Sequence, residues 1–318
     1  MSPMVAAPPH FDANPAFWTA TLIFILAYVI IVSEKIHKTV VAICGAALML
    51  LFKIVDQHEA FHVEEFGVDW NVIFLLIGMM IIINLIRPTG FFEYIAIKSA
   101  KLGRGEPVRI LIIFALVTAG LSALLDNVTT VLLVAPVTLF IADALDVDPV
   151  PYLIIEAIAS NIGGTATLIG DPPNIMIASK AKLTFMDFII HLTPVVVIIM
   201  AVLVLVIHLV FGRRLRTSPE LQQRVLAMDE KAAITDPLLL KKSFFVLALV
   251  LAGFVFHGPL HYEPATVALF GAGLLLLLSG TREPQKVLAD IEWPSLFFFI
   301  GLFIIIGAVV KVGLIKWM

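Results

Sequence analysis

Two short polar stretches interrupt an otherwise hydrophobic sequence, and both could bind an ion. The first is Asp126-Asn127, which stands between the apolar arms Pro107 to Leu124 and Val128 to Leu145. The second is Ser160 to Asn174, which holds three glycines, two prolines and several hydroxyl or amide side chains. Oxygen ligands of this kind suit a small cation, whereas the starts of helices attract an anion. The two stretches therefore support a site for either sign of charge.

The candidate ion ligands share a side-chain oxygen or a carbonyl in a flexible backbone. They are Asp126, Asn127, Thr129, Glu156, Asn161, Gly163, Gly164, Thr165, Thr167, Asp171 and Asn174. An ionisable group at membrane depth is costly to bury, so it marks a functional site by default.

Each of the three acids also has a simpler explanation. In the simpler explanation, Asp126 lies at the membrane surface and its one role is to cap the second apolar arm. Glu156 could accept a proton one turn before the Gly/Pro-rich stretch, or it could be a glutamate at a helix end in the membrane interface. Asp171 is the weaker candidate, because capping of the helix that follows it would by itself account for an aspartate.

The Gly/Pro-rich stretch predicts a broken helix. Glycines and prolines at this density do not sustain a regular helix, and Asp171 before Pro172 predicts a new helix start. Within a bilayer such a break is tolerated only where protein or a wet cavity covers the freed backbone groups. Secondary transporters bind substrate and coupling ions at breaks of this kind. The alternative is an ordinary loop outside the membrane.

The composition predicts an all-α polytopic membrane protein. Hydrophobic residues make up 60% of the 318 residues and charged residues only 14%, against roughly 25% charged in soluble domains. The one cysteine, Cys44, excludes a disulfide framework and a multi-cysteine metal site. The sequence contains no HExxH, no P-loop and no pairing of a nucleophile with a base, so we expect no enzyme and no cofactor beyond a bound Na⁺.

Apolar runs and polar gaps divide the chain into four parts. We expect a polar N-terminal tail at 1–16, a first repeat at 17–211, a cytoplasmic linker at 212–242 and the start of a second repeat at 243–318. Within the first repeat we expect a re-entrant hairpin at about 107–145, a broken helix at about 150–182 and one long span from Phe185 to Phe211.

An internal repeat is visible in the sequence. The stretch Val68 to Gly78 matches Ile291 to Gly301 at an offset of 223 (291 minus 68). The same offset also relates Gly90 to Gly313. The stretch 41–46 matches 267–272 at an offset of 226 (267 minus 41). Chance similarity between apolar spans is the alternative, but an acid-Trp pair at the start of both copies argues against it.

The distribution of lysine and arginine predicts the topology. Basic residues are concentrated in 212–242, with Arg213 and Arg214 at its start, and this places the segment in the cytoplasm. We interpret the arginine cluster as a topology signal and not as a nucleic-acid-binding patch. The N-terminus then lies outside, and Trp70 to Ile86 and Trp293 to Val310 cross the membrane in opposite directions, so the repeats are inverted. The second copy stops before any counterpart of the hairpin or the break. We therefore expect a second repeat that is incomplete, as in a truncated reading frame, a fragment or a piece of a split protein.

The residues around both polar stretches also carry a family resemblance. The sequences Leu125-Asp126-Asn127-Val128-Thr129-Thr130 and Asn161-Ile162-Gly163-Gly164-Thr165-Ala166-Thr167-Leu168-Ile169-Gly170-Asp171-Pro172-Pro173-Asn174 resemble the ion transporter superfamily. The likeness is to the ArsB/NhaD permease group with its citrate transporter-like domain, and within it to the P protein type. This resemblance implies two inverted repeats, each with a re-entrant hairpin and a broken helix. It also implies a homodimer with elevator motion in the plasma or inner membrane.

The same resemblance gives expectations for the site. By likeness to the dicarboxylate/sodium branch, Asn127 lies at the hairpin tip, and Gly163, Gly164, Thr165 and Asn174 line the first ion site. A bound Na⁺ would then lie near Asn127, Gly163 and Thr165. That branch has Ser-Asn-Thr at the tip, where this chain has Asp126-Asn127-Val128. The additional acid favours proton or cation antiport.

We therefore expect a secondary active transporter that couples a small ion or anion to the movement of protons or sodium. Asp126 is expected to exchange a proton for a cation during transport. One alternative is a sodium- or proton-coupled symporter of di- or tricarboxylates such as citrate. Another is an inactive remnant or a subunit of a split transporter. The expected partners are the lipid bilayer, a small ion and a second copy of the chain.

Overall fold

The computed structural model describes residues 14–62, 66–212, 214–260 and 262–317. These residues form helices and connecting turns, with no strand among them. Six helical segments in the described ranges are long and apolar enough to cross a bilayer. They are α1 (Pro15–Val32), α4 with the turn after it (Trp70–Thr89), α7 (Asn127–Ala144), α11 (Thr193–Phe211), most of α13 (Pro237–Leu260) and α16 (Trp293–Lys311). The prediction of an all-α polytopic membrane protein is confirmed.

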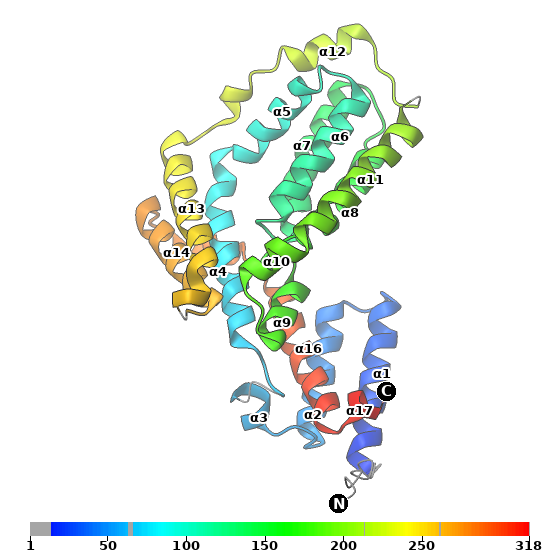
Figure 1. Cartoon of the computed structure of the whole chain (residues 1–318), viewed down its shortest axis with the longest axis vertical. Coiled ribbons are helices and arrows are strands. Elements are labelled where there is room, and N and C mark those ends of the chain that lie inside the picture. The colour runs from blue at the N-terminus through cyan, green and yellow to red at the C-terminus, as the bar shows by residue number, and fades with distance from the viewer. Residues whose placement is uncertain (1–13, 63–65, 213, 261, 318) are drawn as a thin grey trace, which may run out of the picture. The chain divides into compact units, whose positions relative to one another are not determined.

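Shorter helices connect and cover these segments (Figure 1). They are α2 (Lys38–Leu51), α3 (Gln57–His62), η1 (Arg87–Thr89), α5 (Phe91–Leu102), α6 (Pro107–Ser122), α8 (Val150–Gly164), α9 (Pro172–Ala181), α10 (Phe185–His191), α12 (Pro219–Leu226), η2 (Glu230–Ala233), α14 (Pro264–Ser279), α15 (Pro284–Ala289) and α17 (Leu314–Trp317), while α4 itself is Trp70–Ile86. Many of them begin at a proline, which is well placed there because the first helical N–H has no partner within the helix.

Two predicted boundaries are wrong. The segment Phe185 to Phe211 is not one span, because α10 ends at His191 and α11 begins at Thr193. Pro194 has no N–H to donate to the carbonyl of Ile190, and its ring crowds that carbonyl, so the helix is interrupted just before it, at Leu192. The span after the linker begins at Pro237, six residues before position 243. Residues 1–13 of the predicted tail and Arg213 lie outside the described residues.

Residues 1–73 and 292–318 form one compact unit, in which α2 and α16 pack side by side. The hydroxyl of Thr39 donates to the carbonyl of Pro294 at 2.8 Å, near the start of both helices. At the other end of α16, Lys311 forms an ion pair with Glu59 of α3 at 2.6 Å. The two helices are therefore parallel, and α16 ends at α3.

The start of α4 lies at this same end of the first unit. The indole N–H of Trp70 donates to the carbonyl of Phe61 in α3 at 2.9 Å. Thus α4 begins where α16 ends, while α16 begins at Trp293, at the far end of a helix of 19 residues. The membrane directions of the two copies stay a prediction.

Residues 74–291 form the second unit, and its contacts repeat those of the first. In the second unit, a Cβ added to Gly78 of α4 would lie 2.8 Å from the carbonyl carbon of Ala268 in α14. In the first, a Cβ on Gly301 of α16 would lie 2.6 Å from the carbonyl carbon of Ala42 in α2. Gly78 and Gly301 are equivalent at the offset of 223, and Ala42 and Ala268 at 226. Each copy therefore packs its glycine-bearing helix against the other copy's shorter helix.

A second pair of contacts follows the same rule. Gly45 of α2 lies against Ile305 of α16, and Gly271 of α14 lies against Val250 of α13 and, slightly farther away, Ile82 of α4. The two glycines and the two isoleucines match at the same two offsets, and chance similarity of apolar spans would not produce matching contacts. The exchange of partners supports a true internal repeat.

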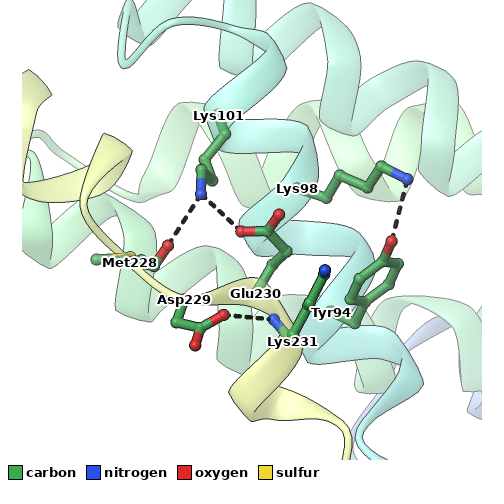
Figure 2. Close-up of polar contacts among 7 residues, drawn as sticks. All are labelled: Tyr94, Lys98, Lys101, Met228, Asp229, Glu230 and Lys231. Carbon is green, nitrogen blue, oxygen red and sulfur yellow. Dashed lines mark hydrogen bonds and ion pairs between the residues drawn. The ribbon is translucent and has the colours of Figure 1, made fainter.

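The segment 212–242 packs against other helices of the second unit and is not a loose linker. Figure 2 shows Lys101 of α5 donating to Glu230 at 2.6 Å and to the carbonyl of Met228 at 3.1 Å. Further along, the hydroxyl of Thr235 donates to the carbonyl of Pro88 at 2.6 Å. The backbone of Ala233 lies so close to Gly90 that a side chain at Gly90 would not fit. These contacts hold the segment against α5 and against the turn at Pro88 to Gly90 that precedes α5.

Candidate functional site

The predicted hairpin consists of α6 and α7, joined by a short turn at 123–126 (Figure 1). Asp126 is the N-cap of α7, and its carboxylate accepts from the backbone N–H of Thr129 at 2.8 Å. The side chain is also buried, with 9% of its surface exposed. Asp126 therefore caps α7, as the simpler explanation predicted, but the cap lies inside the protein and not at an exposed surface.

The predicted helix break lies between α8 and α9. Helix α8 continues through Ser160 and ends at Gly164, residues 165–171 are non-helical, and α9 begins at Pro172. The prediction that the middle of Ser160–Asn174 is not helical is confirmed. The side-chain amide of Asn174 donates to the carbonyls of Gly164 at 3.0 Å and Thr167 at 2.8 Å. Asn174 therefore binds carbonyl groups that the break leaves without helical partners.

The hairpin tip lies directly against this break. Ser122 donates to the carbonyl of Ser160 at 2.7 Å, and Thr167 donates to the carbonyl of Ala123 at 2.5 Å. On the outer side, the amide of Asn127 donates to the side-chain oxygen of Asn161 at 2.9 Å. Residues 166–170 are buried. The alternative of a loop exposed to solvent is therefore excluded for this segment, whereas its depth in the bilayer stays a prediction.

Several predicted ion ligands already have a partner within the break. The carbonyl of Gly163 accepts from the N–H of Ala166 at 2.9 Å, and the hydroxyl of Thr165 donates to the carbonyl of Asn161 at 2.8 Å. The carbonyl oxygen of Gly163 and the hydroxyl oxygen of Thr165 each have two lone pairs, so each could still contribute one lone pair to a cation. Asn161 and Thr165 are exposed, as a site that ions enter requires.

The capping explanation for Asp171 is wrong. Asp171 occupies the N-cap position of α9, but its side chain makes no capping hydrogen bond. It is half-buried and lies close enough to Asp126 for the two carboxyl groups to repel each other. Neither acid forms an ion pair with a described residue. The junction of tip and break therefore has two uncompensated acids.

Glu156 is not an interfacial residue at a helix end. It lies in the middle of α8 with none of its surface exposed, and the hydroxyl of Thr138 in α7 donates to its Oε1 at 2.5 Å. Its Oε2 has no hydrogen-bond partner within the described chain. The sequence analysis did not single out Thr138 or Ser122 as site residues. Both are small hydroxyl residues in apolar helices, and their partners lie 18 and 38 positions away.

No three His, Cys, Asp or Glu side chains converge in the described residues in a way that would hold a metal ion. A cation at the tip and break would instead need carboxylate, carbonyl, hydroxyl and amide oxygens together. Hard cations such as Na⁺ and Ca²⁺ accept such a set.

Comparison with known proteins identifies the family. The family model described as Citrate transporter matches residues 28–318, which include the hairpin and the break. The chain belongs to the citrate transporter family. The resemblance found in the sequence is therefore confirmed at the level of the family.

Proteins with similar sequences occur in bacteria and mammals. An uncharacterized transporter of Mycobacterium tuberculosis is 50% identical over 297 residues, which cover 93% of this chain and 69% of the relative. A 46 kDa membrane protein of Mycobacterium leprae is 46% identical over the same shares. The P protein of Homo sapiens is 31% identical over 371 aligned positions, covering 94% of this chain and 44% of the P protein. The chain thus spans less than half the length of the P protein.

Proposed function

We propose that this membrane transporter is a secondary active transporter in which a cation, Na⁺ or H⁺, drives the movement of a small ion. The observation that carries this proposal is the junction of hairpin tip and broken helix, where Asp126 and Asp171 lie close enough to repel each other and neither forms an ion pair with a described residue. A bound cation would relieve the repulsion between the two carboxylates. The binding of one cation therefore stabilises the conformation in which tip and break are in contact.

A second candidate is cation-coupled symport of a di- or tricarboxylate. The first turns of α7 and α9 lie at the same junction, and the backbone N–H groups of a helix start attract anions. The family description names citrate. Under this alternative, the carboxylates of the protein hold the cation, and the helix starts hold the anion beside it.

The membrane setting is part of the proposal. Segment 212–242 lies in the cytoplasm, and the N-terminus lies outside. The protein acts as a homodimer in the plasma or inner membrane, and the hairpin and broken helix move together as one body. The hydrogen bonds between Ser122 and Ser160, and between Thr167 and Ala123, support such a joint movement. An inactive remnant would show none of the fluxes described next.

Transport into proteoliposomes tests both candidates. The full-length gene product is reconstituted with a pH-sensitive dye inside the vesicles, and Na⁺ or pH gradients are imposed with and without radiolabelled citrate. Antiport predicts proton movement driven by Na⁺ without citrate, whereas symport predicts citrate uptake that requires the cation gradient. Flux at the level of protein-free vesicles in every arm would contradict the proposal.

The key variants are Asp126→Asn and Asp171→Asn. Asparagine caps a helix about as well as aspartate, so Asp126→Asn removes the charge and keeps the cap of α7. We expect folded protein in which cation-driven flux falls to background. Asp148→Asn, which changes an exposed carboxylate in the turn before α8, is the matched control. Unchanged flux and an unchanged pH profile in Asp126→Asn would exclude Asp126 as the coupling residue.

A further inference from the structure

The buried carboxyl group of Glu156 is not needed for any contact between the hairpin tip and the break. It lies in the core of the second unit, between α7 and α8, and is fully shielded from solvent. A carboxylate without water and without a paired cation is costly in such a place. A residue with only a packing function would be apolar here, as its neighbours Ile155 and Ala159 are.

Within the described residues, no charged side chain forms an ion pair with Glu156. Tyr152, one turn earlier in α8, is the titratable group nearest in the helix, and its hydroxyl donates to the carbonyl of Pro107 at 2.8 Å. The acidic, basic and histidine residues of the neighbouring helices are exposed, except for Lys101, which is paired with Glu230. On α5 they are Glu93, Lys98 and Lys101, on α6 Arg109, on α7 Asp143 and on α11 His208.

Thr138 allows Glu156 to exist in two protonation states. A hydroxyl group can donate to an ionised carboxylate, and it can accept from a protonated carboxylic acid. The separation of 2.5 Å between Thr138 Oγ1 and Glu156 Oε1 places the two oxygens within hydrogen-bonding distance. The other oxygen, Oε2, has no described donor and can hold the proton itself.

Glu156 is also mechanically linked to the junction of tip and break. It lies eight residues before the end of α8 at Gly164, which is about 12 Å along a helix axis. One turn beyond it, the carbonyl of Ser160 accepts the hydrogen bond from Ser122 at the hairpin tip. A displacement of α8 relative to the hairpin formed by α6 and α7 would therefore disturb both this bond and the bond between Thr138 and Glu156.

From these contacts we propose that Glu156, together with Thr138, is a proton-binding site within the hairpin and broken helix, and that the proton binds and leaves once in each transport cycle. This inference rests on the proposed function, because it identifies a residue that carries the coupling proton. The ion at Asp126 and Asp171 and the proton at Glu156 would then occupy separate sites on one moving body.

The first test is independent of transport. Infrared difference spectra of the reconstituted full-length protein at acid and alkaline pH report the carbonyl band of a protonated carboxylic acid. We expect one such band to disappear on alkalinisation in the unmodified protein and to be missing in Glu156→Gln. Asp143→Asn, an exposed carboxyl group on α7, is the matched control and should leave the band in place. A band unchanged by Glu156→Gln, or unresponsive to pH, would overturn the proposal even if transport itself is observed.

The second test is flux. In Glu156→Gln we expect proton movement in the dye assay to fall to background, while exchange of radiolabelled Na⁺ or citrate across the membrane persists. Thr138→Ser, which keeps the hydroxyl, should retain the pH profile, and Thr138→Val should shift it. If Glu156→Gln does not fold, Glu156→Asp replaces it and should show a shifted titration of the band. An unshifted titration of the band and an unchanged pH profile of transport would show that Glu156 has only a structural role. If the unmodified protein moves no ion, the proposed function fails, and the infrared titration still decides on Glu156.

Discussion

Gly163 of α8 rests directly on the backbone of Ala119 in α6. A Cβ atom added at Gly163 would lie 2.1 Å from the carbonyl oxygen of Ala119, a distance that no real pair of such atoms adopts. The absence of a side chain at position 163 therefore lets the hairpin and the broken helix approach closely. The bond from Ser122 to Ser160 depends on the same approach.

Substitution Gly163→Ala is expected to separate α6 from α8. Because the atom in conflict belongs to the backbone, the helices themselves must move, and overpacking of this kind costs about 1–3 kcal/mol of stability. Thermal unfolding in detergent micelles measures the loss, and flux in proteoliposomes should fall with it. The control is Gly120→Ala in α6, where an added Cβ meets no atom within 4 Å. Equal effects of the two substitutions would contradict this explanation.

The internal repeat predicts matched effects at two distant glycines. Gly78→Ala should push α4 away from Ala268, and Gly301→Ala should push α16 away from Ala42 in the same way. We expect each substitution to lower stability by about 1–3 kcal/mol. Gly273→Ala in α14 meets no atom within 4 Å and should be nearly neutral. A large loss for only one of the first two would argue against equivalent contacts in the repeats.

The docked segment 212–242 should loosen in acid. The hydrogen bond and charge of Lys101 lower the pKa of Glu230, so the carboxylate stabilises the folded state above the ordinary glutamate pKa of 4.5. This contribution is lost as the pH falls through the lowered pKa of the folded state. Glu230→Gln should therefore have a lower melting temperature than the unmodified protein at neutral pH, and the difference should vanish in acid.

The matched control for Glu230→Gln is Glu283→Gln. Glu283 pairs with Lys286 within one short, exposed helix, so its removal should change stability little at any pH. Hydrogen exchange of 228–235 provides a second measurement, because acid should increase exchange there before the membrane helices respond. A difference between Glu230→Gln and the unmodified protein that persists at low pH would contradict the role of the ion pair.

The two copies should cross the membrane in opposite directions. Cys44 is first replaced by alanine, since it is exposed and would itself react. Single cysteines are then introduced as Asp69→Cys and Glu292→Cys, at the starts of α4 and α16. A thiol reagent that does not cross membranes should label Asp69→Cys from outside and Glu292→Cys only from inside. Labelling of both from one side would refute inverted repeats.

The sequence by itself determined the class of the protein and the position of its irregular parts. Hydropathy is a local property, and a run such as Trp70 to Ile86 must be a helix wherever its backbone is removed from water. The break was equally local, because α8 ends at Gly164 in a glycine-rich stretch and Asp171-Pro172 is the sequence of a helix start. The repeat was visible because its equivalent residues recur at fixed offsets.

The tertiary structure decided which of the polar residues meet. Nothing local distinguishes Thr138 from other threonines in apolar helices, and its bond to Glu156 exists only because α7 packs against α8. Asp171 has the sequence of a helix cap, yet its side chain points to no backbone N–H, and it lies near Asp126 because the hairpin tip rests on the break. Partners such as Ser122 and Ser160 are brought together by helix packing, a property of whole surfaces that short-range sequence patterns do not encode.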